Sequence, residues 1–178
     1  ACGDYYHGER YIGIDKRIAG LANVRMLEGD WRIDRELFLF SGITGRKYFA
    51  QGNLSLRKRE AGKEMPDSFA HEQCLAITQE GGNLLISGCA HNGILNILDR
   101  YQELFSDAPK MVISGFHMMK KGEYSQEEQE AICATARELA GMDTVFYTGH
   151  CTGEQAYAWM EPLMGGKLKK MYSGMRIC

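Results

Sequence analysis

The chain has 178 residues, a hydrophobic fraction of 44%, a charged fraction of 25% and a formal net charge of −2. This length suffices for a single domain, residues 1–178, with a hydrophobic core, and the composition is typical of a globular protein. The small net charge argues against nucleic acid and anionic membrane as partners, and no apolar run approaches the roughly 20 residues that span a bilayer. Six cysteines without a Cys-x-x-Cys pair favour a reducing, cytoplasmic location over a disulfide framework.

The first third of the chain has weak periodicity. Residues 1–22 are rich in glycine and polar side chains, which predicts a loop with a short strand at 11–14. Alternation predicts a strand at 23–27, and an aromatic and apolar run predicts another at 37–43. Residues 44–66 hold six basic residues and little periodicity. We interpret them as a mobile loop because charge runs are usually solvated; the alternative is a lid over an acidic or phosphorylated substrate.

From Asp67 onward the pattern becomes regular. Apolar runs predict strands at 74–78, 83–87, 110–114 and 144–147, helical periodicity predicts helices at 93–105, 125–140 and 153–164, and a strand-like tail covers 168–177. The second helix begins with a capping box, Ser125-x-x-Glu128, and ends at Gly141. The βαβαβα order of residues 83–164 predicts an α/β fold with a mainly parallel sheet and helices packed against it.

Three of the five histidines follow the carboxyl ends of three successive predicted strands, each shortly after a glycine. They are His91 after 83–87, His117 after 110–114 and His150 after 144–147. The carboxyl ends of parallel strands meet at one edge of the sheet, where ligand sites form. Neutral imidazole is a common ligand of zinc-like ions and a usable general base near neutral pH. The pattern therefore predicts one shared site; His7 lies outside it.

Two further groups of residues offer chemistry near these loops. Asp67, His71 and Glu72 precede a strand and suit either a divalent cation or the support of a ligating imidazole. Cys89 and Cys151 are close to the histidines, so a cysteine nucleophile activated by histidine is an alternative. No phosphate-binding P-loop, dinucleotide fingerprint or serine nucleophile elbow is present in the sequence.

The segments DSFAHEQCLAI, GGNLLISGCAHNGILNIL, VISGFHM and YTGHCTG resemble the C-terminal half of the metallo-β-lactamase-fold hydrolases. Within that superfamily they are similar to the branch of dihydropterin–ribofuranosylaminobenzene-phosphate synthase-like proteins. The resemblance is specific over residues 67–155 and looser before them.

The resemblance implies half of an αββα sandwich with a mixed sheet and one or two divalent metals. In such a site a metal-bound hydroxide attacks a phosphoester or similar bond of a small molecule. His91 and His150 would be metal ligands, and a substrate-contacting or supporting role would fall to His117, Glu72, Asp67, His71 and Cys89. Zinc is the favoured metal, while manganese and iron also suit imidazole and carboxylate. Lys and Arg side chains from 46–59 could contact a phosphate.

The main metal motif of the superfamily, His-x-His-x-Asp-His, has no counterpart here, because no two histidines lie closer than twenty residues apart. A chain that starts at Ala1 without this motif looks like the back half of a longer protein. Two histidines do not complete a catalytic zinc site, which usually takes three protein ligands. Half a sandwich also leaves an apolar sheet face uncovered. We therefore expect an N-terminal half or a second copy as partner, and no hydrolase activity alone; the alternative is a non-catalytic, oligomerising binding module.

Overall fold

The computed structural model describes residues 4–177. Its elements are β1 (Asp4–His7), β2 (Arg10–Tyr11), the 3-10 helix η1 (Lys16–Gly20), β3 (Trp31–Arg32), β4 (Leu37–Phe40), η2 (Gln51–Ser55), β5 (Leu56–Glu60), β6 (Lys63–Pro66), β7 (Cys74–Ile77), β8 (Leu84–Ile86), α1 (Ile94–Leu104), β9 (Met111–Ile113), α2 (Gln126–Ala140), β10 (Val145–Thr148), η3 (His150–Thr152), α3 (Glu154–Met164), η4 (Gly165–Lys167) and β11 (Leu168–Lys170). Within these residues no helix is both long and apolar enough to cross a membrane.

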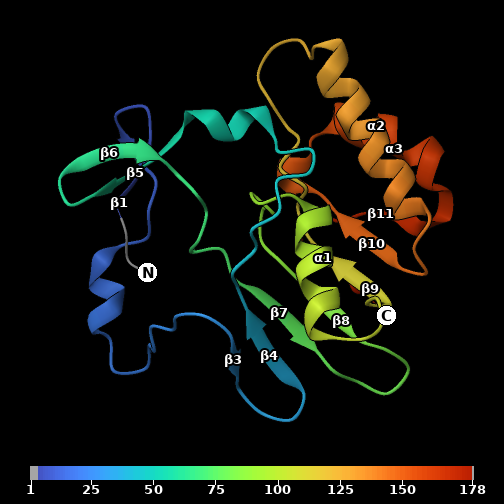
Figure 1. The fold of residues 1–178 in the computed structure, drawn as a ribbon. Coiled ribbons are helices and arrows are strands. Elements are labelled where there is room, and N and C mark those ends of the chain that lie inside the picture. The colour runs from blue at the N-terminus through green and yellow to red at the C-terminus, as the bar shows by residue number, and fades with distance from the viewer. Residues whose placement is uncertain (1–3, 178) are drawn as a thin grey trace.

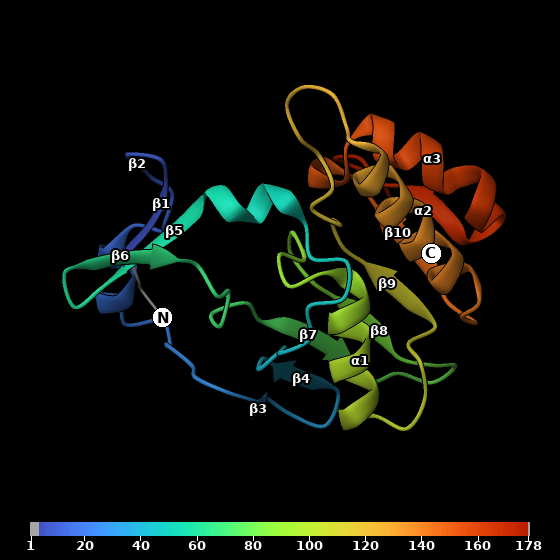
Figure 2. The ribbon, with the colours of Figure 1, turned by 45° about the horizontal axis from the view of Figure 1, so that its top comes forward.

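A seven-stranded mixed sheet forms the centre of the main body, with the strand order β11-β10-β9-β8-β7-β4-β3. Strands β8, β9, β10 and β11 run parallel to one another, whereas the pairs β3–β4, β4–β7 and β7–β8 are antiparallel. The βαβαβα order predicted for 83–164 is confirmed by β8-α1-β9-α2-β10-α3. Because right-handed crossovers that step in one direction place their helices on one side, all three helices cover the same face. Figures 1 and 2 show α1 lying over β8 and β9.

The capping box predicted for α2 is present. The Ser125 hydroxyl accepts a hydrogen bond from the Glu128 backbone N–H at 3.2 Å, and the Glu128 carboxylate accepts one from the Ser125 backbone N–H at 2.7 Å. Gly141 is the C-cap, as expected. These local signals set both ends of the helix, and its buried positions Ile132, Ala136 and Leu139 then pack into the core.

The two faces of the seven-stranded sheet differ in burial. The row under the helices is fully buried and runs through the register partners Ala76, Leu85, Val112 and Phe146. The two rows on the opposite face are half-buried and consist of Leu75, Ile86, Ile113 and Tyr147, and of Ile77, Leu84, Met111 and Val145. We call these eight residues the open sheet face. Its apolar character is what the sequence predicted for half of a sandwich.

A smaller sheet with the order β2-β1-β5-β6 stands apart from the large one, and η2 lies between them (Figures 1 and 2). It corrects our expectation that residues 44–66 form a loop. Strand β5 has the sequence LRKRE and gives no hydrophobic alternation, yet it pairs with both β1 and β6. An ion pair of 3.4 Å between Arg57 and Glu64 joins β5 to β6. The mobility of the segment stays a prediction.

Other expectations for the early part of the chain were wrong in detail. Residues 23–27 form no strand; Val24 instead closes a turn by donating its N–H to the Leu21 carbonyl at 3.0 Å. Of the strand expected at 11–14 only Tyr11 lies in a strand, the two-residue β2, and residues 4–7, expected as a loop, form β1. A five-residue alternation is a weak signal because a strand also needs a partner edge. The C-terminal tail keeps only the three residues of β11.

Candidate functional site

The loops after β8, β9 and β10 meet at one edge of the large sheet and bring the three strand-end histidines into one region. The rings of His91 and His117 are 4.0 Å apart between centroids. The ligand atoms of Cys89, His150 and Cys151 lie within 4.8 Å of one another. The expected convergence is therefore observed, while the metal-ligating role of His91 and His150 stays a prediction.

These loops adopt a backbone conformation that is costly for residues with side chains. Ala90, His117 and His150 have φ angles of +54°, +47° and +50°, and Phe69, which packs on His91, has +53°. A residue other than glycine in this region costs on the order of 1–3 kcal/mol, and such residues concentrate at functional sites. Main-chain hydrogen bonds between the loops hold them in place: Gly115 donates to the Gly88 carbonyl at 2.9 Å.

Glu72 supports the loop that carries His91. Its carboxylate accepts the backbone N–H groups of His91 at 2.7 Å and Asn92 at 3.0 Å, and also the Asn92 side-chain amide at 2.8 Å. The Phe69 ring stacks on the His91 ring with centroids 4.8 Å apart and planes within 6°. The predicted residue Glu72 thus lies beside the site and uses both of its oxygens to hold the loop.

Asp67 and His71 lie farther from the strand ends. The Asp67 carboxylate is 3.7 Å from Nδ1 of His71 and accepts the Phe69 backbone N–H at 2.8 Å. The His71 ring packs against Tyr5 at 4.2 Å, and burial lowers the pKa of His71. Both residues line a separate cavity of about 430 Å³ that also contacts the small sheet. Phe69 is the link between this group and His91.

Electrostatics separate the roles of the two thiols. A hydrogen bond with the Cys151 thiol and the nearby His91 ring lower the pKa of Cys89 to about 3. The same hydrogen bond, together with burial, raises the pKa of Cys151. Cys89 is therefore a thiolate at neutral pH and Cys151 a protonated donor. The Sγ of Cys151 packs directly against Gly115. A Cβ atom at residue 115 would lie only 2.4 Å from this sulfur, so a residue larger than glycine does not fit there without displacing it.

His117 is a neutral imidazole with an unused nitrogen. Burial and the nearby His91 lower the pKa of His117 to about 4. Its Nδ1 is buried and has no hydrogen-bond partner among residues 4–177. A buried polar atom without a partner is costly, so this nitrogen is available to a ligand.

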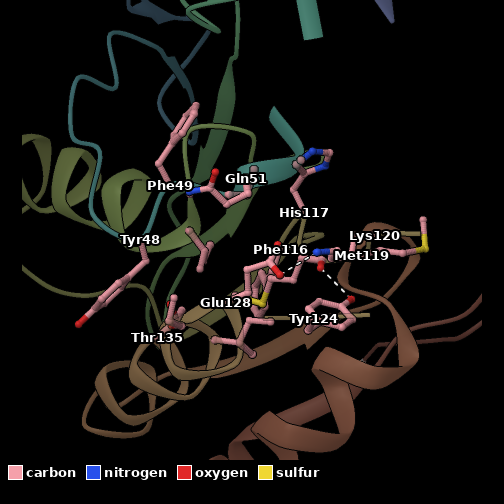
Figure 3. Close-up of a pocket in the computed structure, with 18 of the residues that line it drawn as sticks. Tyr48, Phe49, Gln51, Phe116, His117, Met119, Lys120, Tyr124, Glu128 and Thr135 are labelled. Carbon is pink, nitrogen blue, oxygen red and sulfur yellow. Dashed lines mark hydrogen bonds and ion pairs between the residues drawn. The ribbon is translucent and has the colours of Figure 1, made fainter. Parts of the chain in front are cut away.

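A cavity of about 560 Å³ adjoins His117. Its walls combine aromatic, methionine and aliphatic side chains with a few charged groups, and Figure 3 shows Tyr48 and Phe49 across from Met119, Lys120 and Tyr124. Lys120 is paired with Glu128 at 2.7 Å, and the Tyr124 hydroxyl donates to the Met118 carbonyl at 3.0 Å. Lys47 also lines the cavity and forms an ion pair with Glu138. The cavity can take an organic group of small-molecule size.

Sequence reasoning missed Asn53, which is 2% exposed and contacts His91. The sequence predicted Arg46 only as one of the cations of 46–59 that could contact a phosphate; its guanidinium donates to the Asn92 side chain at 3.1 Å and to the Ser68 carbonyl at 3.1 Å. Both residues belong to the basic segment 44–66, and no local pattern predicts their contacts with the His91 loop. The sequence suggested Cys151 as a possible nucleophile, but not as a member of a group that could hold a metal.

No protein-family model matches the sequence. Two curated relatives come from Methanocaldococcus jannaschii: an uncharacterized protein, 31% identical over 65% of this chain and 44% of that protein, and the 7,8-dihydropterin-6-methyl-4-(beta-D-ribofuranosyl)-aminobenzene-5'-phosphate synthase, 33% identical over 75% of this chain and 48% of that enzyme. The chain spans less than half of the length of both.

A crystal structure of a metal-dependent hydrolase of the β-lactamase superfamily matches with a TM-score of 0.78 and 31% identity, over 97% of this chain and 66% of that one. The sequence motifs, the mixed sheet with its helices on one face and these similarities agree. The chain belongs to the metallo-β-lactamase superfamily and is related to its dihydropterin–ribofuranosylaminobenzene-phosphate synthase-like branch.

Proposed function

We propose that this chain supplies the C-terminal part of a metal-dependent hydrolase that acts on a phosphoester or similar bond of a small molecule. The observation that carries the proposal is the convergence of Cys89, His150 and Cys151, with ligand atoms within 4.8 Å of one another, beside His91 and His117. The structural relative is itself named a metal-dependent hydrolase.

The side chains at this place fit a divalent metal. Imidazole nitrogen and thiolate sulfur are the donors that zinc prefers, and thiolate favours zinc over manganese. His91 and His150 would hold the ion together with the Cys89 thiolate, and the unused Nδ1 of His117 points to a further ligand contact. A bound divalent ion would supply Lewis-acid chemistry, polarising the scissile bond and lowering the pKa of water.

The chain's own residues position these groups. Glu72 holds the His91 loop through three hydrogen bonds. Thr152 joins the His150 loop to the loop that carries His117, since the Thr152 hydroxyl accepts a hydrogen bond from the Phe116 backbone N–H at 3.0 Å. The 560 Å³ cavity beside His117 would accommodate the organic part of the substrate. Among the cations of 46–59, Lys47 lines this cavity and is the candidate for contact with a phosphate.

The open sheet face supports the proposal of a partner. Its eight apolar residues are only half-buried, although their neighbours on the helix side are fully buried. An apolar surface of this kind is expected to be covered by another layer. The layer would be an N-terminal half of the same fold or a second copy of this chain, and without it we expect no turnover.

Metal analysis tests the proposal. Elemental analysis on a preparation of verified intact mass is expected to find near-stoichiometric zinc. His150→Ala should lose that metal, while Cys133→Ala should keep it, because Cys133 on α2 belongs neither to the group of Cys89, His150 and Cys151 nor to the lining of the cavity beside His117. Wild-type protein that stays metal-free after incubation with zinc would overturn the proposal. Because one curated relative is a synthase, activity assays should include group transfer as well as phosphoester hydrolysis.

A cysteine nucleophile is the second candidate, and the thiolate character of Cys89 favours it. The two candidates respond differently to chelation. A metal-dependent activity disappears with a chelator and returns with zinc. A Cys89-dependent activity survives the chelator and is abolished by alkylation of the thiol.

A further inference from the structure

Asn53 contacts both the main chain and the ring of His91. Its side-chain nitrogen Nδ2 donates to the His91 carbonyl oxygen at 2.7 Å. Its side-chain oxygen Oδ1 lies 3.1 Å from Nδ1 of the His91 ring. The two contacts use both ends of one amide group, and Asn53 is 2% exposed. Water therefore does not compete for either contact.

These contacts determine which nitrogen of His91 carries the proton. A carbonyl oxygen only accepts hydrogen bonds, so the Asn53 end that faces it must be the NH₂ group. The opposite end, facing the ring, is then the acceptor Oδ1. An acceptor at 3.1 Å from Nδ1 requires a hydrogen on Nδ1. In the neutral ring the proton therefore lies on Nδ1, and Nε2 has a free lone pair.

We propose that Asn53 is a positioning residue that fixes His91 in the Nδ1–H tautomer and thereby presents Nε2 as its metal-binding atom. The part about the metal rests on the proposed function, in which His91 is a ligand; the part about the tautomer does not. Hydrogen bonds from the second nitrogen of a ligating histidine commonly set its tautomer and orientation.

The surroundings of Asn53 suit this role. Its backbone N–H donates to the Ala50 carbonyl at 3.0 Å, which fixes it within η2. The helix lies between the small sheet and the histidine loops, as Figure 2 shows. Phe69 fixes the plane of the His91 ring by stacking. The contact with Asn53 then determines which way Nδ1 and Nε2 of the ring point within that plane. The basic segment 44–66 thus provides a support of the site.

The test is long-range ¹H–¹⁵N correlation NMR of the histidine rings in the metal-free protein at about pH 8, where imidazole is neutral. His91→Gln assigns the signals. The wild type is expected to show the Nδ1–H tautomer for His91. Asn53→Ala should shift His91 toward the Nε2–H tautomer and weaken zinc binding by about 10–100-fold, the range for loss of such a partner. Asn23→Ala, a change at an exposed asparagine, should do neither.

Asn53→Asp keeps an acceptor for Nδ1–H and should retain the wild-type tautomer, which provides a second variant if Asn53→Ala fails to fold. A wild-type protein with the Nε2–H tautomer at His91 would overturn the inference, as would an unchanged tautomer in a folded Asn53→Ala variant. Absence of zinc binding by the wild type, with the Nδ1–H tautomer observed, would refute the proposed metal function and leave the tautomer assignment standing.

Discussion

Replacing Glu72 by Gln tests whether its carboxylate holds the His91 loop. The carboxylate accepts three hydrogen bonds, two of them on the oxygen that faces Asn92. In glutamine one of the two oxygens becomes an NH₂ group, which would face an N–H donor. If the amide keeps its oxygen toward Asn92, the variant loses the 2.7 Å bond from the His91 backbone.

A hydrogen bond to a charged group contributes roughly 1.5–3 kcal/mol. We therefore expect Glu72→Gln to lower the free energy of unfolding by about 2 kcal/mol. In a chain of this size that corresponds to a decrease in Tm of about 4–8 °C. Urea unfolding and thermal unfolding measure both quantities. Glu80→Gln is the matched control, because Glu80 is exposed, and it should change the unfolding free energy by less than about 0.5 kcal/mol.

A double-mutant cycle with Asn92→Ala separates loop support from a general loss of charge. Groups that share hydrogen bonds show a coupling energy of about 0.5–3 kcal/mol. The reasoning is refuted if Glu72→Gln is as stable as the Glu80→Gln control, or if the effects of the two site substitutions simply add.

Four further outcomes are expected. Gly115→Ala should displace the Cys151 sulfur, because the new Cβ would lie 2.4 Å from it, and should weaken zinc binding measured by calorimetry. Gly20→Ala, where the new Cβ meets open space, should leave zinc binding unchanged. Leu85→Ala should cost about 2–5 kcal/mol in urea unfolding, because Leu85 is 0% exposed, and Leu54→Ala, 64% exposed, close to none. Ile113→Glu should abolish self-association or partner binding through the open sheet face, read out by light scattering after gel filtration; an unchanged assembly would contradict that role. Folding lowers the pKa of His117 from 6.5 to about 4, so between these pH values the unfolded chain binds more protons than the folded chain. The free energy of unfolding should therefore fall as the pH decreases from 6.5 to 4. Urea unfolding at several pH values should show a smaller decrease for His117→Gln.

The sequence predicted the part of the fold that is determined locally. Strands β7 to β10 are short apolar runs, and α2 carries its own capping box. The position and the type of these elements could therefore be inferred without knowledge of tertiary contacts. Strand β5 could not be inferred in this way. Its charged side chains lack alternation, and its partner β1 lies about fifty residues earlier in the chain, where no local pattern records the pairing.

The candidate site, like the fold, has one part that the sequence predicts and another that it does not. Convergence of the three histidines follows from the parallel strand order, which the pattern of elements predicts. The thiolate at Cys89 depends on how Cys151 and His91 pack around it, and the contact from Asn53 to His91 crosses 38 residues of sequence. Side-chain contacts of this kind can be identified only from the three-dimensional structure, because neither the spacing of residues nor the composition of the sequence predicts them.

The positive φ angles of His117 and His150 also bear on how this chain would respond to selection in the laboratory. Asparagine and glycine adopt that backbone conformation more readily than histidine does. His117→Asn and His150→Gly would therefore relieve strain in the folded chain and are expected to raise its Tm. A directed-evolution screen that rewarded heat resistance alone would favour such exchanges and would remove the chemical groups of the site while improving the scaffold. Thermostable variants of this chain should accordingly be selected with zinc binding as a second criterion.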